Sequence, residues 1–229
     1  MRGAQISSFV RWHERTSNAR TLSELIVGYT LILLAIWTPG ITQRLFMFTA
    51  ACWIAVTSLR DNDVLYGLRP SHLRHSWWIL VAAAALSTSI VAVAVRLETF
   101  QIPVRYQQSP ARTLGYIVWS FVQQFILQDY FLLRLRRLLA NARAAVLAAA
   151  FLFSVAHLPS PLLTVAALFW GIASCALFLR YRDLYSLAVA HAILGLCILV
   201  TVPDRVHHQM RVGLGYLQYH AATYSAQPQ

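Results

Sequence analysis

Four ionisable residues lie inside strongly apolar stretches of the sequence. Asp129 and Arg134 belong to WSFVQQFILQDYFLLRLRR, His157 ends the segment FSVAH, and His191 lies in LYSLAVAHAILGLCILV. In lipid, ionisable side chains are costly, so they usually face the interior of a helix bundle, where they pair or react. We therefore predict that three apolar segments bring these residues together in one buried polar site.

One carboxylate and two imidazoles are suited to hydrolysis by two routes. Such a set can bind Zn²⁺ and leave one coordination position for water, as catalytic zinc sites do. Without a metal, the carboxylate can act as general base on a water while His and Arg stabilise the oxyanion. Zinc is thus a candidate cofactor, with Asp129, His157 and His191 as its ligands, and a site without any cofactor is the alternative.

Each of these residues also has a purely structural interpretation. Asp129 can pair with Arg134 or Arg136, or form hydrogen bonds with Gln124 or Gln128. Glutamines in apolar helices more often join helices than react. Either histidine can be satisfied by hydrogen bonds within the bundle. The prediction of an active site therefore depends on whether these side chains meet.

The composition predicts the elements that position these residues. Of 229 residues, 58% are hydrophobic and 12% are charged, and the mean hydropathy is +0.55. A soluble domain is about 45–50% apolar and about 25% charged. All 19 basic residues are Arg, and they fall between apolar runs. We therefore expect contacts with anionic lipids and no binding to nucleic acid.

The apolar runs predict an all-α, polytopic transmembrane helix bundle of about seven spans, because a spanning helix needs about 20 mostly apolar residues. The expected spans are residues 22–37, 44–58, 77–95, 113–139, 144–157, 162–179 and 184–202. Pro and Gly close several of them, and the arginines indicate a cytoplasmic N-terminus. We expect an integral protein of the bacterial plasma (inner) membrane.

Four regions follow from this pattern. They are a basic arm (1–21), N-terminal membrane helices (22–112), core helices that carry the site (113–202) and a polar tail (203–229). Glu24 falls at the mouth of the first span, so we expect it to be a boundary residue. His207 and His208 fall in the polar tail, where we expect them to be solvated.

The site residues resemble the motifs of a known family. An acid followed five positions later by Arg, then FxxxH, then a His in the last apolar helix, resembles the CAAX protease and bacteriocin-processing (CPBP, or Abi) family of intramembrane proteases. The resemblance covers about residues 115–200, and the GLRP segment at 67–70 is also similar. Phe153 to His157 match the second motif fully. The core would then be CPBP-like.

This resemblance implies a function and roles for the residues. The chain would be a membrane endopeptidase that cleaves a peptide or a lipidated protein in the membrane, and a metalloendopeptidase if the site holds zinc. Asp129 would activate water, and Arg134 would hold that acid in place. His157 and His191 would orient water or metal and support the oxyanion.

Three residues depart from the family motifs. Asp129 and Tyr130 stand where the first motif has two glutamates, and Gly195 stands where the third has Asn or Asp. These departures motivate an alternative, a degenerate and non-catalytic CPBP-like membrane protein that acts as a binding partner or scaffold. A small transporter or channel is a third class, but the sequence shows no internal repeat.

Overall fold

Helices make up most of the computed structural model, which describes residues 2–60 and 73–225. The described residues contain no strand, so the predicted all-α class is confirmed. Each of the seven expected spans coincides with a helix or with a run of consecutive helical segments.

The elements follow one another along the chain with short connections. In order they are α1 (Arg2–Trp37), α2 (Gly40–Leu59), α4 (Leu73–Arg96), α5 (Val104–Gln107), α6 (Pro110–Phe125), the π-helix η2 (Ile126–Leu132), α7 (Leu133–Leu138), α8 (Ala142–Val155), α9 (Pro161–Tyr181), α10 (Leu184–Thr201), α11 (Asp204–His207), the 3₁₀-helix η3 (His208–Met210) and α12 (Gly213–Ser225).

Polar and cyclic residues set the ends of the core helices. The Asn141 side chain accepts a hydrogen bond of 2.9 Å from the backbone N–H of Arg143 and thereby caps α8. Pro161 occupies the first turn of α9, where its missing N–H costs nothing. Asp183 caps α10 and also accepts a hydrogen bond from the Ser76 hydroxyl on α4. The cap therefore ties α4 to α10.

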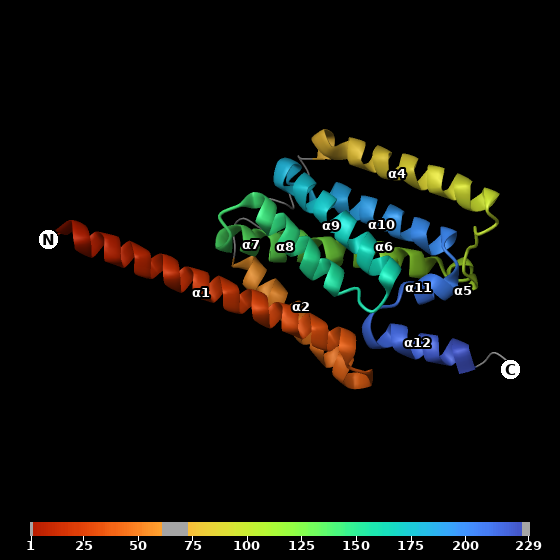
Figure 1. Ribbon diagram of the computed structural model, residues 1–229, viewed down its shortest axis with the longest axis horizontal. Coiled ribbons are helices and arrows are strands. Elements are labelled where there is room, and N and C mark those ends of the chain that lie inside the picture. The colour runs from red at the N-terminus through yellow and green to blue at the C-terminus, as the bar shows by residue number, and fades with distance from the viewer. Residues whose placement is uncertain (1, 61–72, 226–229) are drawn as a thin grey trace.

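The helices pack side by side around a continuous central segment, with α4 and α10 running parallel (Figure 1). The main packed pairs are α1 with α2, α8 with α9, and α10 with both α4 and α6. Gly171 lets α9 approach α8 closely, since a Cβ at this glycine would lie 3.1 Å from the Cα of Ala150. Small residues allow such close approach of helices in membranes. The run α6–η2–α7 contacts all of the neighbouring pairs and carries the first candidate motif.

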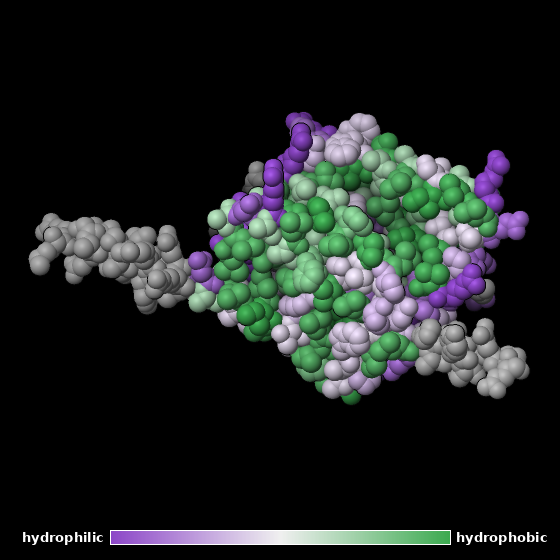
Figure 2. Space-filling model, in the orientation of Figure 1, coloured by the Kyte–Doolittle hydropathy of each residue, from purple (hydrophilic) through white to green (hydrophobic). Residues whose placement is uncertain are grey.

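Four described helices are long and apolar enough to cross a membrane. They are residues 17–37, 74–96, 161–181 and 184–201. Figure 2 shows apolar residues over much of the visible face, with hydrophilic residues gathered toward its ends. This pattern, with many large apolar side chains exposed, is that of an integral membrane protein. Among the described residues, the other predicted spans are helical but are not both long enough and apolar enough to count as membrane-crossing helices.

The basic arm is helical, because α1 already begins at Arg2. One expectation for the C-terminal tail is corrected. His207 and His208 are 1% and 4% exposed, so they are buried and not solvated. They are buried because the tail folds back as α11, η3 and α12, and α12 packs against α1. The GLRP segment lies outside the described residues.

Candidate active site

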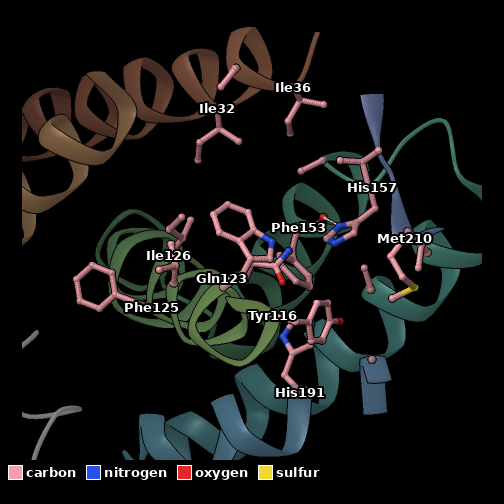
Figure 3. A pocket seen from close by; sticks show the side chains of 18 of the residues that line it. Ile32, Ile36, Tyr116, Gln123, Phe125, Ile126, Phe153, His157, His191 and Met210 are labelled. Atoms are coloured by element: carbon pink, nitrogen blue, oxygen red, sulfur yellow. Dashed lines mark hydrogen bonds between the residues drawn. The ribbon is translucent and has the colours of Figure 1, made fainter. Parts of the chain in front are cut away.

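A cavity of about 950 Å³ opens between the α1–α2 pair and the core helices. Its walls come from both ends of the chain and are mostly apolar. Among its few polar lining residues are Tyr116, Gln123, His157 and His191 (Figure 3). A concave, mainly apolar pocket with a few converging polar groups is the usual form of a binding site.

His157 lies in the turn that follows α8, at one wall of the cavity. Its Nδ1 lies 2.7 Å from the backbone oxygen of Phe153, four residues earlier. A carbonyl oxygen only accepts hydrogen bonds, so Nδ1 must carry the proton. In the neutral ring, Nε2 is therefore an unprotonated acceptor.

His191 projects from α10 into the same cavity (Figure 3). Phe153 lies against both imidazoles, with ring centroids 4.7 Å from His157 and 6.0 Å from His191. The Nδ1 atom of His191 lies 2.9 Å from Nε2 of Gln124. An amide nitrogen only donates, so Nδ1 accepts and Nε2 of His191 carries the proton. The two imidazoles thus have opposite hydrogen-bonding polarity at Nε2.

Gln124 is held in this orientation by a second buried glutamine. The Nε2 atom of Gln128 donates to Oε1 of Gln124 at 3.1 Å and to the hydroxyl of Ser174 at 3.1 Å. Gln124, Gln128 and Ser174 are completely buried. The expectation that the glutamines join helices is confirmed for this pair, which links α6 and η2 to α9 and α10.

Asp129 does not line the cavity with the two histidines. Gln123 and Ile126 line it at the spacing of an α-helix, which would next bring Asp129 or Tyr130 to the same face. The chain is instead a π-helix from Ile126 to Leu132, with hydrogen bonds that reach back five residues. Phe131, five positions after Ile126, therefore occupies the cavity wall.

The Asp129 carboxyl is fully buried, and neither of its oxygens has a hydrogen-bond partner among the described residues. The structural alternatives for Asp129 therefore do not apply either, because it bonds neither Arg134 nor the two glutamines. The charge of Arg182, at the end of α9, acts on this carboxyl. Asp129 is an unsatisfied acid beside the site, and its catalytic role stays a prediction.

Arg134 contacts a different acid from the one expected. Its Nε and Nη2 atoms each lie 3.3 Å from Oε2 of Glu24 on α1. Its guanidinium lies 4.0 Å from the ring centroid of Tyr130 and donates to the backbone oxygen of that residue at 3.2 Å. Glu24 is therefore not a simple boundary residue, because it neutralises the most deeply buried cation of the core.

The donor set does not fit the expected zinc ion. Among the described residues, no group of three His, Cys, Asp or Glu side chains is placed to hold a metal. A catalytic zinc site uses three protein ligands, and the cavity offers two imidazoles. The expected third ligand, Asp129, is turned away by the π-helical segment.

Two residues that the motifs do not assign to the site belong to it: Gln124 sets the orientation of His191, and Tyr116 lines the cavity next to Gly195. Glu24, which neutralises Arg134, lies outside the cavity lining. The partners of Glu24 and Tyr116 are distant in sequence, so local spacing gives no signal for them. The missing side chain at Gly195 was the only available hint for Tyr116.

Comparison with known proteins agrees with the motifs. Residues 105–197 match the family described as type II CAAX prenyl endopeptidase Rce1-like. The matched segment contains Asp129, Arg134, His157 and His191, and the resemblance to CAAX proteases of the CPBP type is confirmed for it. No curated protein and no solved structure matches the chain.

Proposed function

We propose that this chain, which resembles type II CAAX prenyl endopeptidases over residues 105–197, is an intramembrane endopeptidase that acts at His157 and His191. The observation that carries the proposal is the opposite polarity of the two imidazoles in one cavity. One Nε2 can accept a proton and the other can donate a hydrogen bond. Hydrolysis of a peptide bond needs a general base for the attacking water and a hydrogen-bond donor for the developing oxyanion.

In this proposal His157 acts as the general base. Its Nε2 accepts a proton from a water molecule as the water oxygen bonds to the scissile carbonyl carbon. The backbone oxygen of Phe153 holds the ring by accepting from Nδ1–H, and that bond strengthens when the ring becomes positive. His157 then returns the proton to the leaving amine as the C–N bond breaks.

His191 has the complementary role. Its Nε2–H donates to the carbonyl oxygen, which becomes negative when water adds to the carbon. Removing a single donor of this kind typically lowers kcat about 10²–10³-fold, because the donor is preorganised in a site that excludes water. The Gln124 amide maintains the required tautomer by donating to Nδ1.

The cavity favours a substrate with an extended apolar part. Ile32 and Ile36 of α1 and Trp170 of α9 lie among its walls, and none of the described lining residues is Asp or Glu. An apolar peptide segment or the lipid group of a lipidated protein suits such walls. We therefore propose a membrane-associated peptide or lipidated protein as substrate.

The absence of a carboxylate from the described cavity lining also favours the alternative, a non-catalytic binding protein. Both functions are tested by cleavage of lipidated peptides by the purified protein in proteoliposomes, followed by mass spectrometry. We expect cleavage by the wild type and loss of at least about 100-fold in kcat for His157→Ala and His191→Ala. His75→Ala is the matched control, because His75 is exposed and lies outside the cavity.

A folded wild type that binds the peptides without cleaving them would contradict the peptidase and support the binding protein. Equal cleavage by the wild type and both cavity variants would place the chemistry elsewhere. Unfolding temperatures of all four proteins show whether any loss of activity reflects unfolding.

A further inference from the structure

Tyr116 on α6 occupies the space of a missing side chain on α10. A Cβ atom added to Gly195 would overlap the hydroxyl oxygen of Tyr116 and would lie 2.8 Å from its Cζ and 3.1 Å from its Cε1. The phenol therefore extends across the helix interface and ends against the backbone of Gly195. Any larger residue at position 195 would have to displace it.

This position is one helical turn from His191. Residues four apart on a helix share a face, with Cβ atoms about 5–6 Å apart. The Tyr116 hydroxyl stands where a Cβ at position 195 would be, so it lies about that far from the base of the His191 side chain. Both residues, and Gly195 itself, line the cavity (Figure 3).

We propose that the Tyr116 hydroxyl is a second hydrogen-bond donor to the reacting carbonyl oxygen, beside Nε2–H of His191. This inference rests on the proposed function. A phenol is a neutral donor at physiological pH, and its ring holds it rigidly. Two fixed donors stabilise a developing oxyanion better than one.

The same arrangement gives a reason for the departure at position 195. The resemblance expects Asn or Asp there, and this chain has a glycine. Tyr116 places a polar group into that space from another helix. Residue 195 on α10 has no side chain, and the Tyr116 hydroxyl from α6 lies in the space that such a side chain would fill.

The inference is tested with Tyr116→Phe, which keeps the ring and removes only the hydroxyl. We expect kcat for a lipidated peptide to fall at least about tenfold, with KM within about twofold and an unchanged unfolding temperature. Tyr181→Phe is the matched control, because Tyr181 lies at the end of α9 and outside the cavity lining.

An exchange of donors provides the second arm. Tyr116→Ala alone should lose activity, and the double variant Tyr116→Ala/Gly195→Asn should recover part of it, because the shortened residue 116 leaves room for an amide on α10. A fully active Tyr116→Phe, or a double variant no better than Tyr116→Ala, would overturn the role of Tyr116 while leaving the peptidase intact. No cleavage by a folded wild type would overturn the proposed function and this role together.

Discussion

Glu24 on α1 and Arg134 on α7, which are 110 residues apart in sequence, form an ion pair in which Oε2 lies 3.3 Å from both Nε and Nη2. The Arg134 side chain is 1% exposed and that of Glu24 is 16% exposed. The Tyr130 hydroxyl and the indole N–H of Trp53 also donate to the backbone oxygen of Glu24. This network fastens α1 and α2 to the core.

Glu24→Gln should destabilise the protein by about 2–4 kcal/mol, because it leaves a buried guanidinium without a counter-charge. Thermal unfolding in detergent measures the change. Arg20→Gln is the control, since Arg20 also pairs with Glu24 at 2.9 Å but is 63% exposed. An exposed pair contributes about 0–1 kcal/mol. Equal effects of the two substitutions would contradict a structural role for the buried pair.

The two active-site histidines should occupy different tautomers. Selective ¹⁵N-histidine NMR at neutral pH should show Nδ1–H for His157 and Nε2–H for His191, because their partners are a carbonyl and an amide N–H group. Gln124→Leu removes the partner of His191 and should change only the His191 signals. If both histidines showed the same tautomer, the division into base and donor would be wrong.

Asp129→Leu should stabilise the protein and raise its unfolding temperature, because both buried carboxyl oxygens lack partners. Its kcat should fall less than that of His157→Ala, since Asp129 is outside the cavity lining. A loss as large as that of His157→Ala, at unchanged stability, would show that Asp129 acts in the reaction as the family motif implies.

The C-terminal segment formed by α11, η3 and α12, called the C-terminal cap below, should become less stable in mild acid. Burial lowers the pKa of His207 below its ordinary value of 6.5, and nearby His208 lowers it too, while Asp204 opposes the shift. Both ring nitrogens of His207 are engaged, with Nε2 3.0 Å from the Val202 oxygen and Nδ1 accepting from the Met210 N–H at 3.2 Å. Protonation of Nδ1 would break the second bond.

The folded cap favours the neutral His207 ring. The contribution of this ring to the stability of the cap is therefore complete above about pH 6.5 and falls as the pH drops below that value. The backbone N–H of Gly213, which donates to the Leu158 oxygen at 2.7 Å, is a suitable reporter. Its protection from hydrogen exchange should decrease between pH 7 and 5 in the wild type and stay constant in His207→Gln. A constant protection in both would contradict this role of His207.

The helices were predictable from the sequence because apolar length and helix-breaking residues determine them. Pro39, Pro161 and Pro203 stand at or next to the helix boundaries in the structure, as the pattern indicated. His157 and His191 could be singled out from the sequence because an ionisable group in an apolar run is conspicuous, and both line the cavity. Their meeting at Phe153 supports the prediction of one polar site for these two residues.

The contacts of the first motif were not predictable. Spacing rules assume α-helical geometry, and the π-helix from Ile126 to Leu132 rotates Asp129 away from the cavity. Arg134 forms an ion pair with Glu24, which lies 110 residues earlier in the chain. Local spacing in the sequence gives no indication of such a distant partner. His207 was expected in solvent because it falls in the polar tail, and tertiary packing overrides that local pattern.

The most direct test is single-turnover cleavage of a lipidated peptide in H₂¹⁸O by the reconstituted protein. We predict one ¹⁸O atom in the newly formed carboxyl of the wild-type product, and no product from His157→Ala or His191→Ala that fold normally. Cleavage that persists in His157→Ala, or a folded wild type that releases no product from peptides it binds, would contradict the claim that these two histidines hydrolyse a membrane-associated substrate.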